Sequence, residues 1–388
     1  MRIGVVTSSY AISPTDTVTA GIFARDLAQE LALLGHQVHV LTPSKCGQKV
    51  PSSLLNEYYI PWVGGEKDLA SASLRNPLTL LRYATLVVSG SWLVGRYARI
   101  HALEVLLALW AIPSGIFSWV AWKRYGIPYG VWTLGSDIWA RHKYPFGDRI
   151  VRVVLQDARF RFADGIRLAQ ETAQLANAPC EFVPSIRQLP TIAERQIALP
   201  PGPNFLFIGR YERNKGPDIL VEAMRQFLAA GNKAHLHMFG VGSLETYLRR
   251  RARGYEQFIH IGGYAEPATV VAYMRACDWL VIPSRIESIP LVLIDALHMR
   301  LPVIATEVGD MGDLVRRFGI GKVVSTVEPR ALAAALQDAL SCSRTEFAGA
   351  WQEALETFNL RQSALHCIEF LSAARKEHLN GSRDELAL

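Results

Sequence analysis

Short apolar runs alternate with helical patterns along most of this 388-residue sequence. Residues 3–7, 38–41, 105–109 and 129–133 have the character of buried strands, and residues 22–31 carry apolar side chains at helical spacing. Successive strands joined by crossover helices pair in parallel, because the chain returns to the same edge of the sheet before each new strand begins. The alternation therefore predicts an α/β fold with parallel sheets.

The pattern is interrupted at residues 199–203, where three prolines and a glycine stand in five positions. The apolar run at 205–208 then opens a second series of strands and helices. A chain of this length also exceeds one ordinary hydrophobic core. We therefore predict a first domain over residues 1–198 and a second over 199–361, with a final helix over 362–388 that packs back on the first domain.

Composition and short motifs narrow the function classes. Five cysteines are scattered without a C-x-x-C pair, which predicts reduced thiols and neither a disulfide framework nor a zinc site. The net charge is +6, and the basic residues stand in small groups that indicate either solvated helix faces or attraction to an anionic partner. Nucleic acid is not expected as a partner, because no RNA-binding or zinc-finger signature is present. A nicotinamide dehydrogenase is disfavoured, because no G-x-G-x-x-G follows the first strand.

Two apolar stretches raise the question of a membrane. Residues 105–122 carry no charge, but Pro113-Ser114-Gly115 interrupts them, which predicts a strand, a turn and a helix. Residues 74–100 combine leucines with arginines and a tryptophan, and they could form a helix pair over the first domain's core or lie in a membrane interface. The N-terminal apolar run is too short for a signal peptide. We therefore expect a cytoplasmic protein that could touch the inner face of the membrane.

One strand, loop and helix of the second domain bring cations to the edge of the sheet. The strand at 205–208 ends in Gly209-Arg210, and Lys215 follows just before the next helix. Glycine lets a ligand approach the backbone closely, whereas arginine and lysine supply a planar fork and a mobile charge for phosphate oxygens. A second strand runs into the turn Gly240-x-Gly242. Taken separately, a solvated loop and a tight turn would explain these features.

A further strand end delivers a carboxylate. Glu287 follows the strand at 279–282, and a helix starts directly after it. The residues of this predicted helix start are Ser288 or Ile289 at the cap, Pro290 near the first position, and Leu291. Backbone N–H groups of such a first turn bind anions. Asp295 lies eight residues after Glu287, so two carboxylates could bind sugar and ribose hydroxyls; the alternative is a helix start with acidic residues that its dipole favours.

In this order and spacing, the features resemble glycosyltransferase family 4, the group 1 glycosyltransferases, which are retaining enzymes with the GT-B fold. The family's G-R and K-G pairs match Gly209-Arg210 and Lys215-Gly216, and its E-x7-E element matches Glu287 through Asp295. The likeness is strongest over residues 205–324. It extends more weakly into the first domain at residues 20–23, 35–36, 110–115 and 135–137. The resemblance implies two Rossmann-like domains with parallel sheets that face each other across a cleft.

The resemblance also implies a reaction and its residues. A sugar would move from a UDP- or GDP-sugar to a glycan, lipid-linked or small-molecule acceptor. Arg210 and Lys215 would hold the diphosphate, Glu287 would bind hydroxyls of the transferred sugar, and Asp295 would hold the ribose. The other residues implied on the donor side are Gly209, Gly240, Gly242, Ser288, Ile289, Pro290 and Leu291, and those on the acceptor side are Gly21, Ser136 and Asp137. The resemblance also implies that no metal or other cofactor is needed, and the absence of a D-x-D motif agrees with this.

Several positions depart from the family pattern. Asp295 replaces the second glutamate, and Pro290 replaces a glycine whose backbone N–H would face the ligand. Apolar residues stand where many members have histidine, namely Leu107, Leu109 and Leu134. His142 could substitute for these histidines or be a solvated loop residue. Three interpretations therefore stay open: an active transferase, a GT-B-like subunit that binds nucleotide or a partner without catalysis, and a sugar-nucleotide epimerase of similar architecture.

Overall fold

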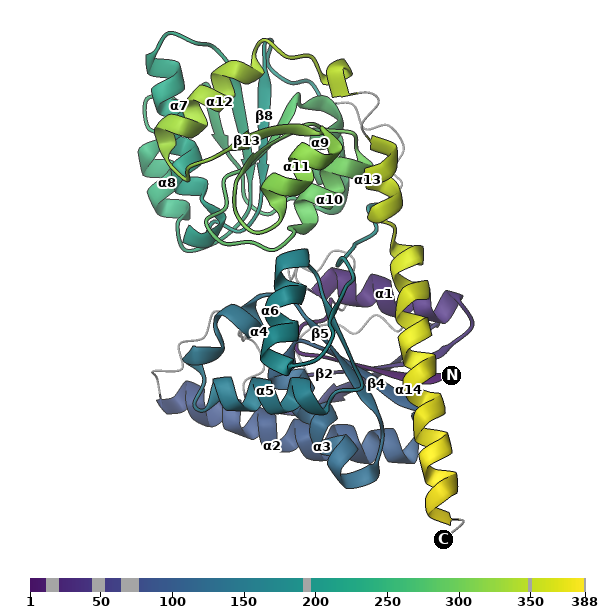
Figure 1. Cartoon of the computed structure of the whole chain (residues 1–388). Helices are drawn as coiled ribbons and strands as arrows, with labels where there is room; N and C mark the ends of the chain where they lie inside the picture. The colour runs from purple at the N-terminus through teal and green to yellow at the C-terminus, as the bar shows by residue number, and fades with distance from the viewer. Residues whose placement is uncertain (12–20, 44–52, 64–76, 191–196, 348–350, 387–388) are drawn as a thin grey trace. The chain divides into compact units, whose positions relative to one another are not determined.

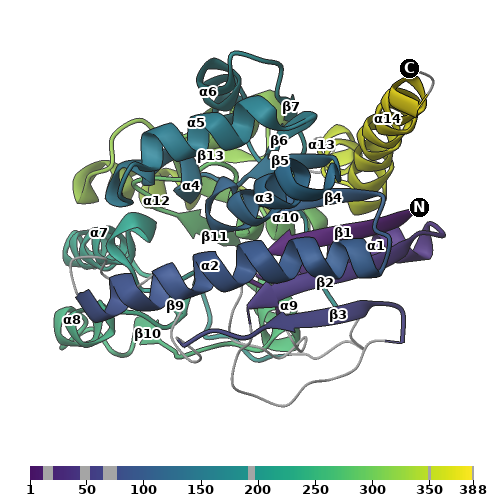
Figure 2. The ribbon, with the colours of Figure 1, turned by 90° about the horizontal axis from the view of Figure 1, so that it is seen from below.

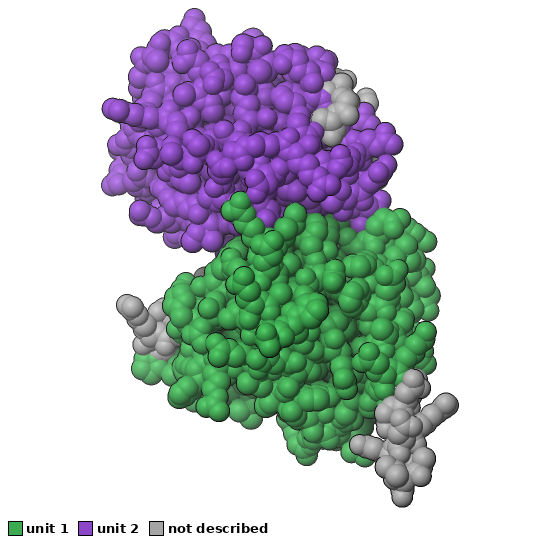
Figure 3. Space-filling view, viewed as in Figure 1, with its two compact units in different colours: residues 1–187, 360–388 green, residues 188–359 purple. Residues whose placement is uncertain are grey.

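The computed structural model describes residues 1–11, 21–43, 53–63, 77–190, 197–347 and 351–386. Ala20, Cys46 and residues 74–76, which belong to segments singled out above, lie outside the described residues. The chain forms two compact units (Figures 1 and 3). Unit 1 consists of Met1–Arg187 and Leu360–Leu388, and unit 2 is Gln188–Asn359. The second unit thus begins at Gln188 rather than at residue 199.

Unit 1 is built on a seven-stranded sheet in the order β3-β2-β1-β4-β5-β6-β7, with every pair parallel. Its strands are β1 (Arg2–Thr7), β2 (Gln37–Pro43), β3 (Asn56–Ile60), β4 (Val105–Leu109), β5 (Tyr129–Thr133), β6 (Phe160–Ala163) and β7 (Glu181–Phe182). The strands β4 and β5 are buried at every residue, as their runs of aliphatic and aromatic side chains require. Because all strands are parallel, the loops that follow β1, β4 and β5 lie at one edge of the sheet.

Helices cover the faces of this sheet. They are α1 (Ile22–Leu33), α2 (Pro77–Ile100), α3 (Ile116–Tyr125), α4 (Ser136–Trp139), α5 (Gly147–Asp157), α6 (Ile166–Ala176) and α14 (Leu360–Leu386), with two short helical turns, η3 (Ala111–Gly115) and η4 (Arg141–Lys143). The uncharged stretch 105–122 is divided into β4, a turn and α3, which confirms the prediction. The helix α14 packs on unit 1, where Arg375 pairs with Glu104 at 2.7 Å and Arg361 pairs with Glu30 at 3.2 Å.

The predicted helix pair at 74–100 is wrong, because α2 is one continuous helix that lies beside α3 (Figure 2). Its glycines do not break it, since they face α3 at close range. A Cβ at Gly90 would lie 2.5 Å from the Phe117 ring, and one at Gly95 would lie 2.8 Å from Tyr125. Among the described residues, α2 is the one helix long and apolar enough to cross a membrane, and a single helix of this kind is weak evidence.

Unit 2 is built on a six-stranded sheet in the order β10-β9-β8-β11-β12-β13, again with every pair parallel. Its strands are β8 (Asn204–Ile208), β9 (His235–Phe239), β10 (Ile259–Ile261), β11 (Trp279–Ile282), β12 (Val303–Thr306) and β13 (Gly321–Val324). Its helices are α7 (Pro217–Ala229), α8 (Glu245–Arg251), α9 (Pro267–Ala276), α10 (Leu291–His298), α11 (Met311–Phe318), α12 (Pro329–Ala339) and α13 (Trp351–Thr357), with the short turns η5 (Arg213–Lys215) and η6 (Arg344–Phe347). The central strands β8 and β11 place the loops that follow them side by side.

Arginines in two basic groups of unit 2 pair with neighbouring carboxylates. Arg249 pairs with Glu245 at 2.9 Å and Arg251 pairs with Glu222. In the other group, Arg316 pairs with Glu307 at 2.6 Å and Arg317 pairs with Glu353 at 2.9 Å. Solvated faces with local ion pairs therefore account for these groups without an anionic partner.

Candidate functional site

Two loops of unit 2 approach each other at the ends of β8 and β9. The Gly209 N–H donates to the Phe239 carbonyl at 3.1 Å, and the Tyr211 N–H donates to the Val241 carbonyl at 2.9 Å. A Cβ on Gly240 would overlap the carbonyl oxygen of Gly209, and one on Gly242 would lie 2.6 Å from the carbonyl oxygen of Tyr211. The close packing of the two loops is thus a sufficient reason for glycine at positions 240 and 242. A contact of Gly240 or Gly242 with the sugar donor stays a prediction.

The loop after β8 also lies against the end of β11. Gly216 has a left-handed backbone with φ of 69°, and Pro217 opens α7 directly after it. A Cβ on Gly216 would overlap the carbonyl oxygen of Pro283. Only glycine combines this backbone conformation with so close an approach. The loop that carries Lys215 is therefore held against the loop that carries Glu287.

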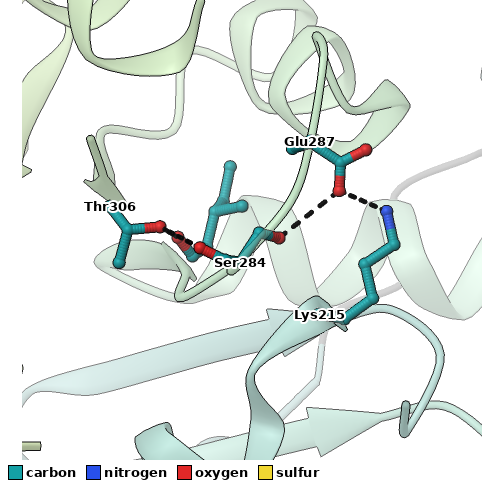
Figure 4. Close-up of polar contacts among 5 residues, drawn as sticks. Lys215, Ser284, Glu287 and Thr306 are labelled. Atoms are coloured by element: carbon teal, nitrogen blue, oxygen red, sulfur yellow. Dashed lines mark hydrogen bonds and ion pairs between the residues drawn. The ribbon is translucent and has the colours of Figure 1, made fainter. Parts of the chain in front are cut away.

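The predicted residues Lys215 and Glu287 meet in an ion pair (Figure 4). The Lys215 ammonium donates to Glu287 Oε2, and the Ser284 hydroxyl donates to the same oxygen at 3.4 Å. The Thr306 hydroxyl, at the end of β12, donates to the Ser284 carbonyl at 2.6 Å and supports this loop from the other side. The side chains of Lys215 and Glu287 are 23% and 14% exposed, so the pair is sheltered and still reachable by a ligand.

Arg210 is the second predicted cation of this loop. Its side chain is exposed, and within the described part of the chain it forms no ion pair. Nearby, Glu212 accepts hydrogen bonds from the Ser243 hydroxyl at 2.6 Å and from the Ser243 N–H at 2.9 Å. Burial acts to raise the pKa of Glu212, but these hydrogen bonds and the charge of Arg210 outweigh it and hold the pKa below its ordinary value. Arg210 thus presents a charge that an incoming anion could bind.

The helix that follows Glu287 starts later than predicted. Neither Ser288 nor Ile289 is its cap; α10 begins at Leu291, and Pro290 takes the N-cap position with φ −71° and ψ 139°. Gly309, with φ of 54°, packs so closely on the backbone before α10 that a Cβ there would overlap the Glu287 carbonyl oxygen. The Ser288 hydroxyl is buried and has no hydrogen-bond partner among the described residues.

Asp295 lies in the second turn of α10 and is completely buried, with an exposure of 0%. Its position eight residues after Glu287 therefore does not place both carboxylates at one surface. A direct contact between Asp295 and ribose hydroxyls would require its surroundings to open. The assignment of the ribose to Asp295 stays a prediction.

The acceptor-side residues lie at strand ends of unit 1. Gly21 precedes α1 and packs so closely on the chain after β1 that a Cβ would lie 2.6 Å from the Ala11 nitrogen. Asp137 is buried and accepts hydrogen bonds from the N–H groups of Ala111 at 2.7 Å and Leu134 at 3.1 Å. Burial raises the pKa of Asp137 to about 6, against the opposing effect of these bonds. Asp137 therefore joins two loops, whereas Ser136 beside it is exposed.

Two of the leucines that replace the family's histidines are part of the core of unit 1. Leu107 and Leu109 lie in the middle and at the end of β4 with exposures of 0%, where they are part of the sheet's core. His142 lies in the turn η4 and is exposed, as a solvated loop histidine would be.

Four residues near the ion pair were not among the predicted site residues: Asp218, Ser284, Arg285 and Thr306. Ser284 and Arg285 stand within the motif that led to Glu287, but nothing in the local pattern distinguishes them from solvated loop residues. Arg285 binds Asp218 through both carboxylate oxygens at 2.7 Å each. These partners are 67 residues apart, so no sequence spacing could have identified them.

Known proteins resemble both the sequence and the fold. The model of a family described as glycosyl transferases group 1 matches residues 202–342. A D-inositol 3-phosphate glycosyltransferase of Thermobispora bispora is 26% identical over 377 residues, which cover 87% of this chain and 86% of that protein. Sucrose-phosphate synthase of Thermosynechococcus elongatus superposes with a TM-score of 0.75 at 20% identity, over 96% of this chain and 98% of that one. An Anabaena protein solved with UDP, and in another structure with UDP-glucose, superposes with a TM-score of 0.69 at 14% identity, over 96% of this chain and 100% of the UDP-bound one.

Two Rossmann-like units with parallel sheets, together with these likenesses, define a glycosyltransferase of the GT-B fold. The region matched by the family model contains the whole loop system from Gly209 to Asp295. Residues 202–342 match the group 1 glycosyltransferases, which confirms the family resemblance predicted from the motifs of this region.

Proposed function

We propose that this chain transfers a sugar from a UDP- or GDP-sugar to a glycan, lipid-linked or small-molecule acceptor, with retention of the anomeric configuration. The observation that carries the proposal is the sheltered Lys215–Glu287 pair at the ends of β8 and β11, with the exposed Arg210 in the same loop as Lys215. Two cations and one carboxylate in this arrangement suit a diphosphate joined to a polyhydroxylated sugar. UDP has the additional support of the Anabaena protein solved with UDP and with UDP-glucose.

In the proposed reaction, the bond between the anomeric carbon and the diphosphate oxygen breaks, and its electrons leave with the diphosphate. Arg210 and the Lys215 ammonium stabilise the charge that develops there, which is the usual largest contribution of such a site. The three N–H bonds of the ammonium let Lys215 bind a phosphate oxygen while it keeps Glu287 in place. Glu287 accepts hydrogen bonds from the sugar hydroxyls, and the acceptor attacks from the face that the diphosphate leaves. Because protein cations balance this charge, we propose that no metal is required.

The donor is tested by thermal-shift measurements with UDP-, GDP- and ADP-sugars, followed by transfer assays with the sugar that stabilises the chain. We expect one uridine or guanosine donor to raise the melting temperature and to release its nucleoside diphosphate, also with a chelator present. Binding without turnover on any acceptor would favour the non-catalytic subunit. Conversion of the donor in the absence of an acceptor would favour the epimerase.

We further propose that unit 1 touches the inner face of the membrane through α2. One side of this helix presents an exposed apolar stripe formed by Leu81, Val88 and Trp92, which are 62%, 71% and 46% exposed. The Thr85 hydroxyl between them donates to the Arg82 carbonyl of the same helix at 2.7 Å. The opposite side packs on α3, so the helix would lie on a bilayer rather than cross it.

The charge of α2 is complementary to an anionic lipid surface. The helix contains arginines and no acidic residue. The Arg96 guanidinium lies 5.1 Å from the centre of the Trp92 ring, an arrangement suited to the boundary between headgroups and acyl chains. A lipid-linked acceptor would be natural for an enzyme held at this surface.

Changing Leu81, Val88 and Trp92 together to glutamine is expected to weaken binding to anionic liposomes by at least about 100-fold, because each buried apolar side chain contributes about 1.5–3 kcal/mol. Flotation at low salt measures the bound fraction. The matched control is Leu33→Gln on α1, where an equally exposed leucine is removed from another face. If the parent chain does not float with anionic liposomes at low salt, the membrane contact is refuted.

A further inference from the structure

The ion pair Lys215–Glu287 joins two loops that have little regular structure of their own. Lys215 ends the short turn η5, and Glu287 stands between β11 and α10. The two residues are 72 positions apart in the sequence. Long side chains on separate loops sample many arrangements, so a defined contact requires that both loops be held in register.

Arg285 is the side chain that joins these loops. Its two terminal nitrogens donate to the two carboxylate oxygens of Asp218, each at 2.7 Å. One of them also donates to the Arg213 carbonyl at 2.6 Å, and the Arg285 N–H donates to the Asn214 carbonyl at 2.7 Å. Arg285, two positions before Glu287, thus forms hydrogen bonds both with the turn that ends in Lys215 and with the first turn of α7.

The Arg285–Asp218 contact is stronger than an ordinary surface pair. The side chains of Arg285 and Asp218 are 27% and 19% exposed, and two parallel hydrogen bonds fix their relative orientation. Burial acts to raise the pKa of Asp218, but the hydrogen bonds and charge of Arg285 outweigh it and hold the pKa below its ordinary value. Asp218 lies in the first turn of α7, where the helix dipole also favours a negative charge.

We propose that Arg285 and Asp218 are positioning residues that hold the Lys215 loop and the Glu287 loop in the arrangement that binds the donor. The expected effect on catalysis rests on the proposed function. The expected effect on the position of the two loops does not depend on that function. Neither residue touches the reacting atoms; both act through Lys215 and Glu287. We call the Arg285–Asp218 pair the clamp. Removing the clamp lets the two loops shift, and shifts of about 1 Å in such sites cost about 100-fold in rate.

The matched control is the pair Arg251–Glu222, which also joins an arginine to a carboxylate on α7, about one helical turn after Asp218, and which involves neither of the two loops. The test variants are Arg285→Lys, which keeps the charge and loses the fork, Arg285→Ala and Asp218→Asn. We expect each to lower kcat by about 10-fold or more with a smaller change in KM for the donor. Arg251→Ala is expected to leave kcat unchanged.

A double-mutant cycle tests whether the clamp acts through the ion pair. If it does, Arg285→Ala costs much less activity in a Glu287→Gln background than in the parent chain. Additive effects, or a parent-like kcat for Arg285→Ala measured well below its melting temperature, would show a merely structural pair and overturn the proposal. If Lys215→Ala and Glu287→Ala keep full activity, it is the proposed site that fails.

A second measurement needs no activity. The Lys215 amine is labelled with an amine-reactive acylating reagent, and the labelling rate is read from its peptide by mass spectrometry. An ammonium held against a carboxylate reacts slowly, so we expect at least about threefold faster labelling in Arg285→Ala and Asp218→Asn than in the parent and in Arg251→Ala. Equal labelling in all four proteins would overturn the proposal whether or not the chain transfers sugar.

Discussion

Replacing Lys215 or Glu287 with alanine is expected to lower the rate of sugar transfer by about 10²–10³, the range found when one group that stabilises developing charge is removed. Lys215→Ala removes a cation from the leaving diphosphate and leaves Glu287 without its partner. Glu287→Ala removes the acceptor for the sugar hydroxyls and releases the Lys215 ammonium. Steady-state kinetics with the donor found by thermal shift measure both variants.

The expected loss is mainly in kcat, because the additional negative charge on the diphosphate develops only as its bond to the sugar breaks. Two controls accompany the variants. Arg249→Ala breaks the ion pair with Glu245, whose two residues belong to neither loop in the sequence. This variant is expected to keep the parent rate. Melting temperatures show whether each variant is folded. Full activity in both Lys215→Ala and Glu287→Ala would refute the site.

Changing Gly216 to alanine is expected to destabilise unit 2 by about 3 kcal/mol or more. The left-handed backbone alone costs about 1–2 kcal/mol for a residue with a Cβ. The larger part comes from the Pro283 carbonyl oxygen, which the new methyl group would overlap, so that the two loops must separate. Hydrogen exchange of the β8 and β11 peptides measures the loss within unit 2 itself.

Gly231→Ala is the matched control for Gly216→Ala. Gly231 follows α7 with a φ of 87°, and a Cβ there would meet nothing within 4 Å. This variant isolates the cost of the backbone conformation, about 1–2 kcal/mol. If Gly216→Ala were no more destabilising than Gly231→Ala, the close approach of the two loops would not exist in solution.

The sequence alone determined the architecture and the region of the site. Period-two and continuous apolar runs depend on neighbours in the chain, so strands such as β1, β4, β8 and β11 could be placed to within about a residue. Short strands such as β10 and β7 have too few residues to form a pattern. The order of Gly209, Lys215 and Glu287 led to the family, and the structure brings Lys215 and Glu287 into contact.

The tertiary structure decided what depends on residues far apart in the chain. The helix α10 starts at Leu291, after backbone on which Gly309 packs closely, and Asp295 is buried within this helix. Asp137 proved to bind the N–H of Ala111 from another loop. Arg285 could be linked to Asp218 only through the fold. Local sequence patterns specify helices and strands, because these depend on interactions between residues close in the chain. The orientation of the site residues comes from contacts that exist only once parallel strands have placed distant loops side by side.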